Sequence, residues 1–169
     1  MAISRRDIRA KVMQAVYACY SSEQEPEKVY ELILLETEQE LAELERAKGM
    51  TGDIKLMNVL YYESIKNAEK YDEYIKGKAT NWNIERIARV DRILMHLAIC
   101  EAISFEEIPI KVTINEYLEL AKLYSTPDSR RFINGILDKL FIDLTRAGYI
   151  VKKGRGLNSD SDKNANSKA

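Results

Sequence analysis

Residues Ile84–Phe105 read IERIARVDRILMHLAICEAISF, and the placement of the apolar residues in this stretch indicates the fold class. They recur at intervals of three and four, which is helical spacing. They also cover more than one stripe of the helix surface, and a helix that is apolar on several sides is packed on several sides. The stretch therefore predicts a helix that lies among other helices.

The rest of the chain shows the same spacing, with only 7 Gly and 3 Pro to interrupt it and no convincing alternating strand. We expect an all-α protein, a compact helical domain at 1–153 with halves at about 1–76 and 84–153. Residues 154–169 are poor in apolar side chains, so we expect a disordered polar tail there. The other expected helices span residues 5–19, 26–48, 53–76, 109–124 and 127–144.

Composition excludes several classes of protein. The net charge of -1 argues against indiscriminate electrostatic binding, so attraction to an anion must come from local patches. Cys19 and Cys100 are far apart, with no CxxC motif, and no apolar run approaches the roughly 20 residues of a membrane helix. The start lacks the pattern of a signal peptide. We expect a soluble, reduced, cytoplasmic protein that does not contact the membrane.

A catalytic or metal site is not expected. His96 is the only histidine, without a neighbouring thiolate or an HxxH spacing, and no glycine-rich loop is present to bind phosphate. We interpret His96 as a packing or surface residue. No enzymatic activity, cofactor or metal is predicted.

Three arginines stand at the start of the first helix. Ser4 and Asp7 form a capping-box pattern there, and Arg5, Arg6 and Arg9 follow Ser4. Positive charge is unfavourable at a helix N-terminus, so these arginines need a negative partner. Arg5 and Arg9 continue the apolar stripe of the helix, which directs them beyond the core. A partner beyond the end of the bundle would satisfy them, in which case replacing the arginines would leave the fold intact. A frayed, solvated helix start is the alternative.

A second basic site lies at the start of the last helix, where Arg130 and Arg131 precede Phe132. An arginine beside an exposed aromatic ring is typical of single-stranded nucleic-acid binding, by phosphate contact and stacking. A phenylalanine at the rim of the core explains the same pattern equally well.

Acidic residues fall into two groups. Residues 23–45 are strongly acidic, which is typical of a solvated helix face and less often of a docking surface. Asp91 and Glu101 instead lie on the apolar side of the stretch at 84–105, where an unpaired carboxylate would be costly. We expect an internal partner for Glu101. Asp91 could equally face a second protein.

Four motifs together resemble the NusB family of bacterial transcription antitermination factors. They read RRDIRAKVMQAVY near the start, then RVDRILMHLAICE, IPIKVTINEYLELAKLYS and SRRFINGILDKL. The resemblance covers the first helix and most of the chain from Trp82 to Leu140, whereas about 21–79 matches only as helices. His96 departs from the pattern, since relatives often have arginine there.

The resemblance implies two small helix bundles without enzymatic activity. It also implies binding to the boxA element of ribosomal RNA transcripts, together with the ribosomal protein NusE, and an indirect role at elongating RNA polymerase. The RNA-binding positions carried over are Arg5, Arg6, Arg9, Arg131 and Phe132. Those carried over for the protein partner are Tyr17, Asp91 and Asp128. The alternative function is a helical protein-interaction module without direct RNA binding.

Overall fold

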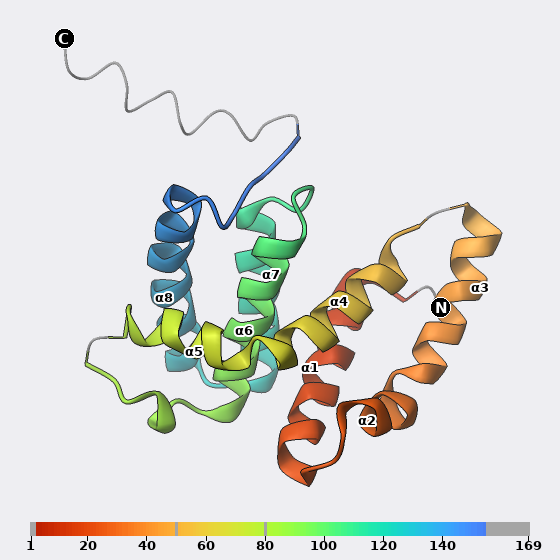
Figure 1. Cartoon of the computed structure of the whole chain (residues 1–169), viewed down its shortest axis with the longest axis horizontal. Coiled ribbons are helices and arrows are strands. Elements are labelled where there is room, and N and C mark those ends of the chain that lie inside the picture. Colours follow the sequence, from red (N-terminus) through yellow and green to blue (C-terminus); the bar gives the residue numbers. More distant parts are fainter. Residues whose placement is uncertain (1–2, 50, 80, 155–169) are drawn as a thin grey trace.

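The computed structural model describes residues 3–49, 51–79 and 81–154, and all regular structure within these ranges is helical (Figure 1). The all-α prediction is confirmed. The expected polar tail lies, apart from Gly154, outside the described residues. The helices are α1 (Arg5–Ser22), α2 (Pro26–Ile33), α3 (Leu35–Lys48), α4 (Asp53–Lys66), α5 (Ala68–Lys76), the short 3-10 helix η1 (Ile84–Arg86), α6 (Arg89–Ser104), α7 (Ile110–Tyr124) and α8 (Pro127–Arg146).

Three of the expected helices are interrupted. The helix expected at 26–48 breaks at Leu34, whose side chain is fully buried. The helix expected at 53–76 breaks at Asn67, where the side-chain amide donates a 2.8 Å hydrogen bond to the Glu63 carbonyl and so competes with helix continuation. The helix expected from Ile84 divides into η1 and α6, because the backbone is extended at Ala88.

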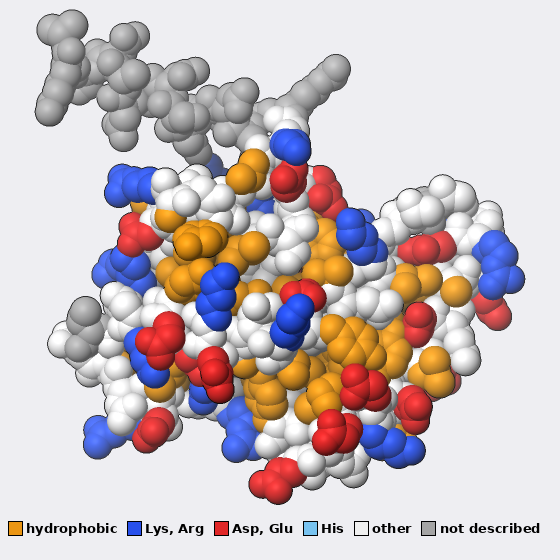
Figure 2. All heavy atoms as spheres, viewed as in Figure 1, with side chains coloured by type: hydrophobic (Ala, Val, Ile, Leu, Met, Phe, Trp, Pro, Cys, Tyr) orange, Lys and Arg blue, Asp and Glu red, His pale blue; other side chains and the backbone are white. Residues whose placement is uncertain are grey.

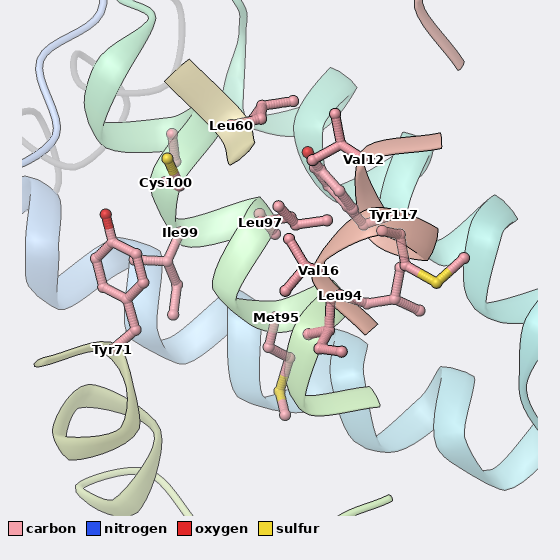
Figure 3. Close-up of a cluster of buried hydrophobic side chains, with 14 of the residues drawn as sticks. Val12, Val16, Leu60, Tyr71, Leu94, Met95, Leu97, Ile99, Cys100 and Tyr117 are labelled. Carbon is pink, nitrogen blue, oxygen red and sulfur yellow. The ribbon is translucent and has the colours of Figure 1, made fainter. Parts of the chain in front are cut away.

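Helix α6 is the centre of the molecule. It contacts α1, α4, α5, α7 and α8, and every residue from Ile93 to Ala102 is buried. This confirms the prediction of a helix packed on several sides. Figure 3 shows side chains of these helices converging on Leu97 and its neighbours on α6, among them Val12, Val16, Leu60, Tyr71 and Tyr117.

The buried apolar residues form one continuous cluster that extends from α1 to the segment after α8. Helices α2 and α3 lie at one end of the molecule and α7 and α8 at the other, with α1 and α4 between them (Figure 1). The division into halves at about 1–76 and 84–153 stays a prediction. None of the described helices is long and apolar enough to cross a membrane.

Two caps fix the helix starts that carry the candidate arginines. At α1 the predicted capping box is present, with Ser4 Oγ accepting from the Asp7 backbone N–H at 3.2 Å and the Asp7 carboxylate accepting from Ser4 at 2.9 Å. At α8, Thr126 Oγ1 accepts from the Ser129 backbone N–H at 3.1 Å, and Pro127 occupies the first turn. Both helix starts are therefore well defined.

Candidate nucleic-acid interface

The side chains of Arg5 and Arg6 reach across to carboxylates on other helices. Arg5 Nε lies 2.9 Å from Asp53 Oδ1 at the start of α4. Arg6 donates through Nε and Nη2 to the two oxygens of Glu116, at 2.9 and 2.8 Å. Both arginine side chains remain 45% exposed. The negative partner that Arg5 and Arg6 need is therefore supplied within the protein, although their side chains stay partly open to solvent.

Arg9 differs from its two neighbours because it is buried, with 3% of its side chain exposed. Its Nε and Nη2 donate to Glu101 at 2.7 and 2.9 Å, and Glu101 also accepts from Thr113 Oγ1 at 2.9 Å and Tyr117 OH at 3.0 Å. Burial alone would lower the pKa of Arg9, but the hydrogen bonds and charge of Glu101 outweigh it and raise that pKa. The internal partner expected for Glu101 is confirmed.

The prediction that Arg9 projects beyond the core is wrong. A helical wheel gives the direction of a side chain but not how far the neighbouring helices extend over it. Here α6 and α7 cover the Arg9 position and supply its hydrogen-bond partners. In this structure the guanidinium of Arg9 is closed to an RNA phosphate.

The starts of α1 and α7 enclose a shallow hollow of about 530 Å³. Ser4, Arg5, Arg6 and Arg9 line one side of it, and residues 107–109, 112 and 116 line the other. The guanidinium groups of Arg5 and Arg6 border this hollow, which is wide open to solvent. An anionic ligand could therefore approach these two arginines.

At the second basic site, Phe132 is partly buried against the core and Arg131 is exposed. The Phe132 ring contacts the ring of Trp82, with 5.5 Å between centroids. The expectation that part of the Phe132 ring is exposed is confirmed. Arg130 is also exposed, and its Nη2 lies 3.8 Å from Glu119 Oε1 on α7.

Helix α7 connects the two basic sites. Its Glu116 binds Arg6 at the start of α1, and its Glu119 lies beside Arg130 at the start of α8. Glutamates three residues apart lie on one helix face, about 4.5 Å apart along the axis. The two sites therefore lie along one edge of the molecule. This basic edge comprises Arg5, Arg6, Arg130, Arg131 and Phe132.

The sequence argument did not find the roles of Glu116 and Glu119. The i, i+3 spacing of the two glutamates was the available signal for a shared face. Glu116 pairs with Arg6, 110 positions before it in the sequence, and Glu119 pairs with Arg130, 11 positions after it. Such pairs follow from helix packing, which the sequence pattern does not specify.

The predicted partner residues occupy different environments. Tyr17 is 42% exposed, and the Arg89 guanidinium lies 5.9 Å from the centroid of its ring. Asp128 is exposed in the first turn of α8. Asp91 is only 4% exposed, and its carboxylate accepts a 2.5 Å hydrogen bond from Ser125 Oγ. Asp91 therefore has an internal partner, and Tyr17 and Asp128 are the accessible members of this set.

Tyr124 is a further exposed aromatic residue near Tyr17. Its hydroxyl accepts a 3.2 Å hydrogen bond from Gln14 Nε2, and Gln14 lies one turn before Tyr17 on α1. Tyr124 is 42% exposed, and its neighbour Leu123 is 70% exposed. Neither residue could be identified from the sequence, because their spacing fits the buried stripe of α7 as well as its rim.

His96 is buried and structural, as predicted. Its Nε2 lies 2.7 Å from Asp72 Oδ1, and Arg92 Nε donates to the same oxygen at 2.8 Å. Burial opposes ionisation of Asp72, but the hydrogen bonds from His96 and Arg92 lower its pKa to about 2. Within the described part of the chain, no group of His, Cys, Asp or Glu side chains could hold a metal ion.

The charged surface is uneven. In one view, Asp and Glu side chains gather around an apolar patch over α2 and α4 (Figure 2). Glu23, Glu25, Glu27 and Glu31 are exposed in this region. Because this surface repels polyanions, it leaves the basic edge as the candidate interface for nucleic acid.

These features define an all-helical scaffold built around one buried helix, with a basic-aromatic edge and a separate aromatic face at Tyr17 and Tyr124. Residues 6–141 match the model of the NusB family. The chain belongs to the NusB family.

Curated relatives agree with this assignment. The chain is 37% identical over 155 residues to the transcription antitermination protein NusB of Salinibacter ruber, covering 91% of each chain. It is 38% identical over 160 residues to that of Chloroherpeton thalassium, covering 93% of this chain and 70% of the relative.

Solved structures show the same fold. T. maritima NusB superimposes with a TM-score of 0.67 at 30% identity, covering 85% of this chain and 94% of that one. A structure of the antitermination factors NusB and NusE in complex with dsRNA matches with a TM-score of 0.63 at 17% identity, covering 82% and 96%. At that identity the second match supports the fold alone.

Proposed function

We propose that this protein is a transcription antitermination factor that binds single-stranded boxA-type RNA together with the ribosomal protein NusE. Membership of the NusB family and relatives named transcription antitermination protein NusB support the proposal. The observation that carries the RNA-binding part is the basic edge, where two arginine sites lie on either side of one face of α7. The protein acts in the cytoplasm as an adaptor without enzymatic activity.

The ion pairs of the basic edge suit it to phosphate binding. Exposed ion pairs contribute about 0–1 kcal/mol to stability, so a phosphate can compete for the arginine at small cost. Arg6 uses Nε and Nη2 for Glu116 and keeps its other N–H donors for a second acceptor. The glutamates thereby orient the arginines before RNA arrives. Arg9 acts indirectly, by holding the start of α1 against α6.

The RNA contacts assigned here are Arg5, Arg6 and Arg131 to phosphates and Phe132 to a base. Phosphate contacts position a strand, whereas base contacts carry sequence information. The NusE face is assigned to Tyr17 and Asp128, with Asp91 holding Ser125 at the end of α7. RNA polymerase is reached indirectly, through this assembly.

A second function is favoured by one observation. Arg5, Arg6 and Arg9 all have carboxylate partners within the protein, so their presence does not require RNA. In that case the protein is a helical interaction module that binds only the protein partner.

An electrophoretic shift separates these functions. A short boxA-type RNA and a scrambled RNA of equal composition are titrated with the protein, with and without the NusE-like ribosomal protein. The proposal predicts tighter binding of the boxA-type RNA, strengthened by the partner. Weak, equal binding of both RNAs, unchanged by the partner, would favour the interaction module.

A further inference from the structure

Trp82, the one tryptophan of the chain, is 60% exposed in the connection between α5 and η1. This connection runs close to the end of α8 at which Phe132 lies (Figure 1). Its backbone is held by a hydrogen bond from the Trp82 N–H to the Ala79 carbonyl at 3.0 Å. The next residue, Asn83, caps η1 by accepting from the Glu85 backbone N–H at 3.1 Å. The indole is therefore presented to solvent directly before the capped start of η1.

The exposure of Trp82 has no explanation in the core. A tryptophan stabilises a fold mainly through the area that it buries, and this one leaves most of its surface in water. Its described ring contact is with Phe132, which the basic edge already contains. Arg131 is exposed at the adjacent position in the sequence. The two rings and a guanidinium thus combine the groups that bind single-stranded nucleic acid.

The geometry of the two rings limits how bases can bind them. A base held between two parallel rings needs about 7 Å between those rings, twice a van der Waals contact of about 3.5 Å. The Trp82 and Phe132 centroids are 5.5 Å apart and the ring planes are inclined by 54°. No base fits between them. Each ring can instead accept a base on its outward side, and the two bases are then inclined to one another.

We propose that Trp82 and Phe132 form a bent platform on which two successive unpaired bases of an RNA stack, and that this platform selects single strands over duplexes. Bases in a regular duplex stay parallel and paired, so they cannot follow two inclined rings. Arg131 binds the phosphate beside the base on Phe132. The inference rests on the proposed function and adds to it a base-contacting residue and a reason for strand selectivity.

The fluorescence of Trp82 tests this directly, because it is the only indole signal of the protein. BoxA-type RNA is titrated in the presence of a saturating NusE-like protein that lacks tryptophan, and a gel shift is run on the same samples. We expect the emission to be quenched with the same midpoint as the gel shift. A duplex of the same sequence should leave the emission unchanged.

Variants supply the energetic test. Trp82→Leu should weaken single-strand binding by about 5- to 150-fold, the range for one stacked base, and Trp82→Phe should retain most of the affinity. Tyr149→Leu is the matched control, since it removes a 52% exposed aromatic ring at the opposite end of α8. Thermal melting should give the same midpoint for Trp82→Leu and the wild type, to within a few degrees.

An RNA with two adjacent abasic nucleotides completes the comparison. It should bind the wild type more weakly, and Trp82→Leu should cause little additional loss on this RNA. If RNA is shifted while the emission of the wild type stays unchanged and Trp82→Leu binds this RNA with wild-type affinity, the platform is overturned and the proposed function stands. If no RNA is shifted at all, both are overturned.

Discussion

Arg9 illustrates how one side chain can resemble a ligand contact in the sequence and serve the core in the structure. Its charge stands in line with Val12 and Val16, but the carboxylate that neutralises it lies 92 positions away on α6. Buried charges persist only when they are paired and hydrogen-bonded, and Glu101 meets this condition through Arg9, Thr113 and Tyr117. The sequence indicated that Glu101 needed a partner, but not that the partner was Arg9.

Replacing Arg9 by methionine should therefore damage the fold. The change leaves Glu101 buried without its counter-charge, and breaking such a pair costs about 3–5 kcal/mol. The double variant Arg9→Met with Glu101→Leu should recover much of this loss, because both charges are then removed. Urea unfolding followed by circular dichroism measures the three stabilities. Arg46→Met, which changes an exposed arginine on α3, is the control. If Arg9→Met and Arg46→Met lower the free energy of unfolding by the same small amount, Arg9 does not stabilise the core through Glu101.

Among the elements, the burial of α6 was predictable from the sequence, although its start at Arg89 was not. Apolar residues on several sides required burial, and the structure places α6 between five other helices. The starts of α1 and α8 were also predictable, because capping residues act locally. The breaks at Leu34 and Asn67 were missed because apolar spacing continues through both positions. They depend on how the helices on either side pack, which is a tertiary effect.

Helix α5 is attached to α6 by an ion pair and hydrogen bonds at Asp72. This carboxylate binds His96 and Arg92, which hold its pKa at about 2, below the ordinary value of 3.8. A lowered acid pKa adds stability that is complete above the unfolded pKa and is lost as the pH falls through the folded one. The contribution is about 2 kcal/mol at neutral pH.

Asp72→Asn should accordingly lower stability at pH 7, and its difference from wild type should shrink between about pH 5 and pH 2. Urea unfolding at a series of pH values measures the difference. For Asp138→Asn, which changes an exposed residue on α8, the difference in stability from the wild type should not shrink as the pH falls. If the difference in unfolding free energy between the wild type and Asp72→Asn stays constant down to pH 2, the carboxylate charge of Asp72 does not hold α5 in place.

At the scale of the whole molecule, the basic edge and the Tyr17 face are built from the ends of helices far apart in the sequence. The resemblance to the NusB family assigned Arg5, Arg6, Arg131 and Phe132 to RNA, which stays a prediction; the three arginines are exposed, Phe132 is partly buried, and α7 pairs with Arg6 and Arg130 of this edge. It also carried over Asp91, which the structure buries beside Ser125. Residue type and position were predictable, whereas depth of burial was not.

Asp128→Lys should weaken the complex with the NusE-like protein while the chain stays folded. Asp128 is exposed, and charged groups at the rim of an interface act on association rate and specificity more than on folding. Calorimetric titration measures the affinity, and melting checks the fold. Asp138→Lys makes the same charge change elsewhere on α8, and equal binding by wild type and Asp128→Lys would remove Asp128 from the partner face.

The arginines of the basic edge are proposed to bind RNA phosphates. For single-stranded nucleic acid, each lost phosphate contact lowers the slope of log affinity against log salt by about 0.7. The triple variant Arg5→Ala, Arg6→Ala, Arg131→Ala should then reduce the magnitude of the slope by about 2, and Arg46→Ala should leave it unchanged.

The measurement is a salt titration of boxA-type RNA binding at saturating NusE-like protein, with wild type, triple variant and control compared. We expect a shallower slope and weaker binding for the triple variant alone, and an unchanged melting midpoint, because the exposed ion pairs that this variant loses contribute little to stability. If the triple variant keeps the slope and affinity of the wild type, RNA phosphates do not bind these arginines, and their role is limited to ion pairs within the protein.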